Sequence, residues 1–288
     1  MSTALLGADA AAWVHLVESS SKPLCRLVLT DVDGVITPGE GQPADLQVLA
    51  RLAEINRAAR HDACVPAVTL CTGRQAPYVE LMAQMTGTFL PCIFEHGAGL
   101  FFPTAFRYLF HPRLGPRYAA DLAALRAALA ATLLDPGRAF VQPGKEASMT
   151  LYPLGSTSLD EIMAAASEAI ERTAAHFDVA RNMTGIEVRP AGIDKGEGAR
   201  WLAEVLGVPL AQFAGVGDSD PDLGFLQRVG FSAAPANATP AIRASVAYVA
   251  SAPHGAGLLE IVALVERRNR QLLEAAHEDP PPPAQRLG

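Results

Sequence analysis

The stretch Asp31-Val32-Asp33-Gly34-Val35 decides the fold of this chain. It follows an apolar run over residues 25–30, which predicts a buried strand. Two carboxylates spaced two residues apart share one face of an extended backbone and repel each other, so a divalent cation or a bend at the strand end must relieve that cost. The carboxyl edge of a parallel sheet is also where open α/β folds bind ligands. Taken alone, the stretch fits an acidic turn equally well, because Asp and Gly are ordinary turn residues.

Three later segments also place polar groups after an apolar run or at a helix start. A second apolar run ends in Thr72-Gly73-Arg74, and a third ends in a cluster of acids that includes Asp218 and Asp222. Lys195 is followed by Gly at the expected start of a helix. In this order the four segments resemble the four motifs of the haloacid dehalogenase superfamily of phosphate-transferring enzymes.

The resemblance extends from about residue 24 to about residue 265. An insert between the second and third motifs resembles the large α/β cap of the superfamily's Cof-like branch, which includes sucrose-phosphate, mannosyl-3-phosphoglycerate and archaeal phosphoglycolate phosphatases. The turn Glu95-His96-Gly97-Ala98 resembles the Glu-Asn-Gly-Ala turn of that branch. The first motif also resembles capless sugar-acid phosphatases, but those chains lack an insert of this size.

The expected fold is therefore α/β, a doubly wound parallel-sheet core with an inserted α+β cap domain. Strand–helix alternation before the insert supports the parallel sheet. We expect the first part of the core over residues 1–102, the cap over 103–185 and the second part of the core over 186–275. In this division residues 186–189 return the chain to the core. A tail with four consecutive prolines, 276–288, is expected to be disordered.

The resemblance implies a role for each motif side chain. Asp31 would be the nucleophile that forms an aspartyl-phosphate, and Asp33 the general acid and then the base that activates water. Thr72 would donate a hydrogen bond to the phosphoryl group, and Lys195 would neutralise negative charge. The implied metal ligands are Asp31, Asp218 and the backbone carbonyl of Asp33, with Asp222 binding or orienting. This all-oxygen set selects a hard cation, Mg²⁺.

Other residues are candidates for substrate binding. The motif neighbours Gly34, Gly73 and Arg74 belong to this group, as does Asn237 before the last expected core strand. Substrate choice is expected in the cap, where Lys145 and Asn182 lie in two polar turns that could face the cleft. Three of the candidate residues also have a non-catalytic explanation. Thr72 could cap a helix, Arg74 could pair with an acid, and Lys145 could be a solvated cation.

Composition narrows the class of protein. The chain has 288 residues, a formal net charge of −7 and no basic stripe, which argues against a nucleic-acid partner. No apolar run approaches the ~20 residues that span a bilayer, and the first residues lack the features of a signal peptide. The four cysteines lack metal-ligand spacing and fit free thiols in a reducing cytosol. We therefore expect a cytoplasmic monomer or homodimer whose partner is a small phosphorylated metabolite, with no membrane contact.

The leading hypothesis is a Mg²⁺-dependent phosphatase that hydrolyses a small phosphomonoester, either a sugar phosphate or a phosphorylated hydroxyacid, through an aspartyl-phosphate intermediate. A phosphotransferase or phosphomutase of the same fold is a second hypothesis. A non-catalytic ligand-binding protein is a third.

Overall fold

The structure is a computed structural model that describes residues 5–18, 24–173, 176–182 and 184–278. Its core is a five-stranded parallel sheet in the order β12-β11-β10-β1-β2. Residues of β1 pair in register with both neighbours, so that Leu27 lies opposite Phe213 and Ala67. The strands are β1 (Leu27–Thr30), β2 (Ala67–Leu70), β10 (Phe213–Val216), β11 (Phe231–Ala234) and β12 (Tyr248–Val249).

Helices cover both faces of this sheet, which is why its central strands are apolar on both sides. Leu27 and Leu29 of β1 pack in one hydrophobic cluster with residues of α1 and α6, whereas Val28 packs in another with residues of α2, α3 and α9. The predicted doubly wound α/β core is confirmed. The core helices are α1 (Gly7–Glu18), α2 (Leu46–Ala59), α3 (Ala76–Met85), α6 (Lys195–Leu206), α7 (Leu223–Leu226), α8 (Pro240–Ser245) and α9 (His254–Glu278), with short 3-10 turns η4 (Leu210–Gln212) and η5 (Asp220–Asp222).

A small antiparallel sheet lies beside β2. It contains β3 (Cys92–Phe94), β4 (Gly99–Phe102) and β5 (Arg107–Phe110), with the 3-10 turn η2 (Glu95–Gly97) between the first two strands. A parallel bridge between Cys71 and Ile93 joins this sheet to the end of β2. Because β5 pairs with β4, the chain is still on the core side at residue 110 and not yet in the insert expected from residue 103.

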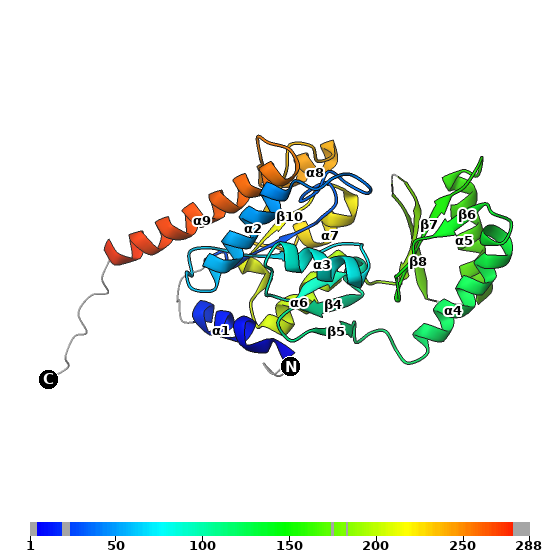
Figure 1. Ribbon diagram of the computed structural model, residues 1–288, viewed down its shortest axis with the longest axis horizontal. Helices are drawn as coiled ribbons and strands as arrows, with labels where there is room; N and C mark the ends of the chain where they lie inside the picture. The colour runs from blue at the N-terminus through cyan, green and yellow to red at the C-terminus, as the bar shows by residue number, and fades with distance from the viewer. Residues whose placement is uncertain (1–4, 19–23, 174–175, 183, 279–288) are drawn as a thin grey trace.

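The insert forms a second unit with its own sheet (Figure 1). It also has its own hydrophobic cluster. Its antiparallel sheet has the order β6-β7-β9-β8, and two helices pack on it. The elements are α4 (Tyr118–Leu129), which continues as a π-helical turn η3 (Ala130–Leu134), β6 (Ala139–Val141), β7 (Met149–Pro153), α5 (Leu159–Thr173), β8 (Phe177–Arg181) and β9 (Ile186–Pro190).

The expectation that residues 186–189 return the chain to the core is wrong. β9 pairs antiparallel with β7 and β8 and thus belongs to the insert's sheet. The reason is a tight turn, in which the Asn182 amide donates to the Gly185 carbonyl at 3.0 Å and folds β9 back onto β8. We propose that the cap unit starts after β5 and ends with β9.

Three remaining expectations concern the termini, the membrane and the cysteines. α9 continues to Glu278, past residue 276 where the tail was expected to start, and residues 279–288 lie outside the described part of the chain. Within the described ranges, no helix is both long and apolar enough to cross a bilayer. All four cysteines are free thiols, as expected.

Candidate active site

The first motif lies where β1 ends. The Asp31 amide donates to the Val216 carbonyl of β10 at 2.9 Å, and the Asp31 carboxylate accepts from the Val32 amide at 2.7 Å. The chain then turns at Gly34, whose φ is +83°. A Cβ at Gly34 would lie 2.2 Å from Asp218 Oδ2, so only glycine allows the first and last motifs to approach this closely. Gly34 thus shapes the site through its backbone.

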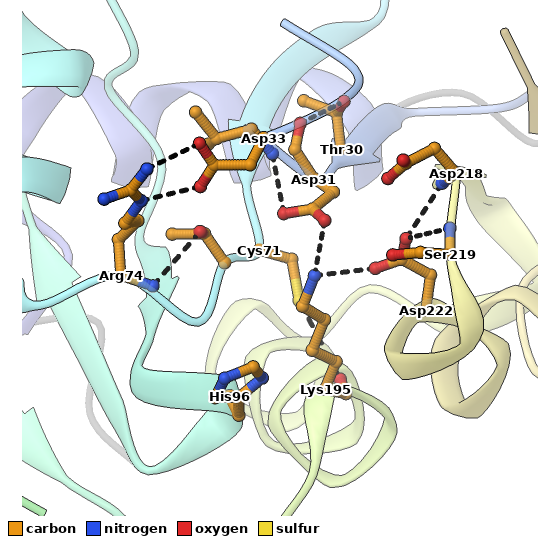
Figure 2. A network of polar contacts seen from close by, with 12 residues as sticks. Thr30, Asp31, Asp33, Cys71, Arg74, His96, Lys195, Asp218, Ser219 and Asp222 are labelled. Carbon is orange, nitrogen blue, oxygen red and sulfur yellow. Dashed lines mark hydrogen bonds and ion pairs between the residues drawn. The ribbon is translucent and has the colours of Figure 1, made fainter. Parts of the chain in front are cut away.

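Lys195 brings the third motif to the same place. It is the first residue of α6, whose N-cap Asp194 accepts from the Glu197 amide at 2.7 Å. The Lys195 ammonium lies 2.7 Å from Asp31 Oδ2 and 2.6 Å from Asp222 Oδ1 (Figure 2). The side chains of all three residues are almost fully buried. This arrangement places a compact positive charge directly against the expected nucleophile.

Asp222 organises the loop that presents Asp218. It forms a capping box with Ser219, and its Oδ2 accepts from the amides of Asp218 at 2.9 Å and Ser219 at 3.2 Å. With Oδ1 bound to Lys195, both oxygens of Asp222 are engaged. Of the two roles expected for Asp222, orienting is the one that these contacts support.

The four charged groups do not balance. Burial raises the pKa of Asp31 well above its usual range, and Lys195 opposes this shift while Asp222 and Asp218 add to it. Burial disfavours the charged form of Lys195, but Asp222 and Asp31 together raise its pKa well above the ordinary value. Burial, followed by repulsion from Asp222, raises the pKa of Asp218 to about 7. Three carboxylates thus face one ammonium.

These residues fit a divalent cation. Ligand atoms of Asp31, Asp218 and Asp222 lie within 4.8 Å of one another. Asp218 Oδ1 is buried and has no hydrogen-bond partner in the described part of the chain. A buried carboxylate oxygen without a donor is costly, and a hard cation such as Mg²⁺ would supply the missing charge. The observation supports the expected metal site.

Asp33 points away from this cluster. Its carboxylate accepts two hydrogen bonds from Arg74, at 2.7 Å from Nε and 2.8 Å from Nη2 (Figure 2). Of the two explanations left open for Arg74, pairing with an acid is therefore the one observed. Thr72 is buried, and its Oγ1 accepts from the Arg74 amide at 3.2 Å. That contact supports the turn after β2 and leaves the hydroxyl proton free to donate.

Gly73 and Asn237 hold backbone in place. A Cβ at Gly73 would lie 2.2 Å from His96 Nε2, so glycine is required by close packing. Asn237 Nδ2 donates to the Gly34 carbonyl at 2.9 Å, and its Oδ1 accepts from the His254 amide at 2.7 Å. The observed contacts of Asn237 thus join the first motif to the start of α9.

The two cap residues meet around a carboxylate that the sequence did not single out, Glu187. Lys145 is buried and donates to Thr150 Oγ1 at 2.6 Å, so the alternative of a solvated lysine is wrong. Asn182 donates to Glu187 Oε1 at 3.1 Å. From the core, His96 Nε2 lies 2.9 Å from Glu187 Oε2. Burial lowers the pKa of Lys145, and the attraction of Glu187 and Glu95 opposes that shift.

Glu95 is the second residue that sequence reasoning missed. Although it belongs to the core, its buried carboxylate accepts from three cap groups: the amides of Glu146 and Ala147, both at 2.9 Å, and Ser148 Oγ at 2.7 Å. Glu95, His96 and Gly97 all have positive φ, at 46°, 57° and 103°. The sequence signal for Glu95 was the Glu-His-Gly-Ala turn. That turn indicates where Glu95 lies in the core but does not indicate which cap groups it binds.

The chain is similar in sequence to the haloacid dehalogenase-like hydrolases. The model of that family matches residues 143–262, and the resemblance predicted from the four motifs is confirmed. A protein from Thermoplasma acidophilum shares the fold with a TM-score of 0.66 at 20% identity, covering 84% of this chain and 99% of that one. The sucrose-phosphatase of Synechocystis, solved with sucrose and phosphate, has a TM-score of 0.61 at 17% identity, covering 84% and 98%.

Curated relatives with detectable sequence similarity are named phosphoglycolate phosphatase. The protein from Pyrobaculum aerophilum is 48% identical over 80 residues, which are 28% of this chain and 35% of that protein. The protein from Methanothrix thermoacetophila is 36% identical over 98 residues, 34% of this chain and 44% of that protein. The matches to these two relatives thus span less than half of either relative's length.

Proposed function

We propose that the protein is a Mg²⁺-dependent phosphomonoesterase that transfers a phosphoryl group first to Asp31 and then to water. The observation that carries this proposal is the buried contact of the Asp31 carboxylate with Lys195, beside a carboxylate oxygen of Asp218 that lacks a partner in the described residues. A lysine at this distance favours the ionised form of Asp31 and opposes the effect of burial, as a nucleophile requires. The family match and the phosphatase names of the relatives support the same reaction.

In the first step, an Asp31 carboxylate oxygen forms a bond to phosphorus as the bond from phosphorus to the ester oxygen breaks. The leaving oxygen takes a proton from the Asp33 carboxyl group. In the second step, a water oxygen bonds to phosphorus, the bond to Asp31 breaks, and Asp33 takes up the proton of that water. The sum is ester plus water giving alcohol plus inorganic phosphate, with both aspartates restored.

The other side chains act on charge and position. Lys195 holds positive charge beside Asp31 throughout, and the Thr72 hydroxyl donates to a phosphoryl oxygen. Asp31, Asp218 and the Asp33 carbonyl would hold Mg²⁺, which would neutralise charge on the transferred group. Asp222 holds both Lys195 and the Asp218 loop in position, because its Oδ1 accepts from the Lys195 ammonium and its Oδ2 accepts from the Asp218 amide.

For the substrate, we propose a small sugar phosphate or phosphorylated hydroxyacid. The relatives' names, phosphoglycolate phosphatase and sucrose-phosphatase, include one example of each class. The cap residues Lys145 and Asn182 would contact the leaving group near Glu187. Oligomeric state and a cytoplasmic location stay predictions.

A screen of phosphate release tests the proposal. The full chain is incubated with Mg²⁺ and a panel that contains phosphoglycolate, sucrose phosphate and other sugar phosphates, with and without added acceptor alcohols. Release of inorganic phosphate from a subset of the panel is expected. Transfer to an acceptor in place of release would indicate a phosphotransferase, and no reaction with any ester would contradict an enzymatic role.

A further inference from the structure

Arg74 contacts a second carboxylate besides Asp33. While Nε and Nη2 hold Asp33, Arg74 Nη1 lies 3.5 Å from Glu40 Oε1. The guanidinium also lies over the ring of Tyr78, 4.9 Å from the ring centroid. A planar guanidinium presents its donors in a rigid fork, so its partners are coupled in position. Where Arg74 is held therefore decides where the carboxylate of Asp33 is held.

Glu40 connects this fork to the cap. It lies in the core segment between β1 and α2. Its carboxylate accepts from Tyr152 Oη on β7, at 2.8 and 3.0 Å, and from Thr184 Oγ1 in the turn between β8 and β9, at 3.2 Å. Both hydroxyls belong to the cap. A continuous set of polar contacts, here named the Glu40 relay, thus runs from the cap hydroxyls through Glu40 and Arg74 to Asp33.

We propose that Glu40 and Arg74 are positioning residues that make the alignment of Asp33 depend on a docked cap. This inference rests on the proposed function, in which Asp33 transfers protons. With the cap docked, Tyr152 and Thr184 fix Glu40, and Glu40 fixes the outer edge of Arg74. When the cap moves away, Glu40 loses both hydroxyl partners and Arg74 loses a fixed neighbour.

The consequence is that proton transfer is efficient only when the cap covers the site. A misplacement of about 1 Å in a catalytic group can cost about 10²-fold in rate. A loosened Asp33 would therefore protonate the leaving group poorly while Asp31 and Lys195 remained intact. The device links chemistry to closure, because ester cleavage is favoured once the cap has excluded bulk water.

Two esters of nearly equal shape separate this role from a purely structural one. Phenolate needs a proton as it leaves, whereas 4-nitrophenolate leaves readily without one. The parameter to compare is kcat/KM, because it reports the first irreversible step, in which Asp31 is phosphorylated. A loss of general-acid alignment should lower kcat/KM for phenyl phosphate and spare 4-nitrophenyl phosphate. A loss of cap binding or folding should lower both alike.

The variants are Tyr152→Phe, Glu40→Gln and Arg74→Lys. Each should lower kcat/KM for phenyl phosphate by about tenfold and change that for 4-nitrophenyl phosphate by less than about threefold, since general-acid catalysis contributes at least about 10²-fold and only part of it is lost. The matched control is Tyr248→Phe. Tyr248 Oη donates to Glu260 Oε1 at 2.5 Å, a contact of the same kind within the core, and this variant should leave both esters unchanged.

Equal losses on both esters would overturn the relay, because the contacts would then serve binding or folding alone. Unchanged kinetics in Tyr152→Phe and Glu40→Gln would overturn it as well. A wild-type protein that hydrolyses neither these two esters nor any ester of the panel would overturn the proposed function and the relay with it, an outcome readily told apart from unaffected variants of an active enzyme.

Discussion

Two buried charge clusters lie close together in this molecule, and they differ in how their carboxylates are paired. The candidate catalytic cluster consists of Asp31, Lys195, Asp218 and Asp222, and it sets one ammonium against three carboxylates. The cap clamp consists of Glu95, His96, Lys145 and Glu187, and it joins the core turn η2 to the cap sheet. The first cluster leaves Asp218 Oδ1 without a partner in the described residues, whereas both carboxylates of the clamp have donors.

The difference supports the proposal that the first cluster binds a cation, whereas the second joins the core to the cap. Burial raises the pKa of Asp218 to about 7, with repulsion from Asp222 adding to it. Burial also acts to raise the pKa of Glu187, but His96 and Lys145 outweigh it and the pKa falls far below 4.5. A buried carboxylate with donors from the protein can stabilise the fold. A buried carboxylate without donors is destabilising unless a cation binds to it. The predictions below test this contrast.

Loss of the nucleophile should have the largest effect. Asp31→Asn keeps the shape of the side chain but removes the negative oxygen that attacks phosphorus. Phosphate release should fall by about 10³-fold or more, with the circular dichroism spectrum unchanged. Asp220→Asn is the matched control, because Asp220 is an exposed acid of the last motif's loop. Near-normal turnover by Asp31→Asn would refute the assigned role.

Removal of the metal should come next. Chelation should abolish phosphate release, Mg²⁺ should restore it, and Ca²⁺ should restore less because of its looser coordination shell. A second readout is independent of turnover. Mg²⁺ at about 100 times its Kd should stabilise the wild type by about 2.7 kcal/mol in thermal unfolding. Asp218→Asn should lose most of this gain.

Full activity after exhaustive chelation would show that the unpaired Asp218 oxygen is not a cation ligand. Equal Mg²⁺ stabilisation of wild type and Asp218→Asn would place the ion elsewhere.

Substitutions in the cap should alter substrate choice more than chemistry. Lys145→Met and Asn182→Ala should raise KM for the best natural ester by about tenfold, because the leaving group loses a polar contact. Hydrolysis of 4-nitrophenyl phosphate should change only a few-fold, since that ester offers little for the cap to bind. Arg138→Gln is a control for general effects on the cap, because Arg138 pairs with Glu161 on the exposed surface.

Unchanged KM values for every natural ester would show that Lys145 and Asn182 serve the structure of the cap alone. Complete loss of 4-nitrophenyl phosphate hydrolysis would place chemistry in the cap.

The smallest effect concerns the stability of the clamp. Because the folded-state pKa of Glu187 lies below its ordinary value of 4.5, its contribution is fully present above that pH and is lost as the pH falls through the range below it. Glu187→Gln should therefore lower the free energy of unfolding by about 1–3 kcal/mol at neutral pH, and by less in acid. Urea unfolding at several pH values measures this difference. Glu168→Gln, on the exposed face of α5, should show none.

A Glu187→Gln deficit that stayed constant with pH would contradict the assigned charge state.

The grouping of the candidate catalytic cluster was predictable from the sequence because its parts are local. Asp31 and Asp218 follow apolar runs that become β1 and β10, and neighbouring parallel strands bring their carboxyl ends together. Lys195 begins a helix that ends at Gly207, whose φ is 69°. Glycine is common at this position of a helix, so the end of the helix was also predictable. The fold class, the order of the motifs and the presence of an insert follow from the same local patterns.

The clamp and the relay were not predictable in this way, because each depends on contacts between distant segments. β9 reads as a core strand by composition, and only its pairing with β7 and β8 assigns it to the cap. Glu95 lies 51 residues from Glu146, whose amide it accepts, and Glu40 lies 112 residues from Tyr152. A glutamate in a polar turn gives no sign of its partner. The turn around Asn182 and Gly185, between two short apolar runs, did carry a hairpin signal that fixes β9.

The most direct test of the account is to trap the phosphoryl group on Asp31. Asp33→Asn is mixed with 4-nitrophenyl phosphate and Mg²⁺, quenched in acid within one turnover, and digested for mass spectrometry. Because 4-nitrophenolate leaves without a proton and the variant lacks the base for the second step, the peptide with Asp31 should accumulate one phosphoryl group on that residue. The double variant Asp31→Asn/Asp33→Asn should show none. The account would be contradicted if the wild type turned over the ester but phosphorylated Asp31 was found neither in the wild type nor in Asp33→Asn.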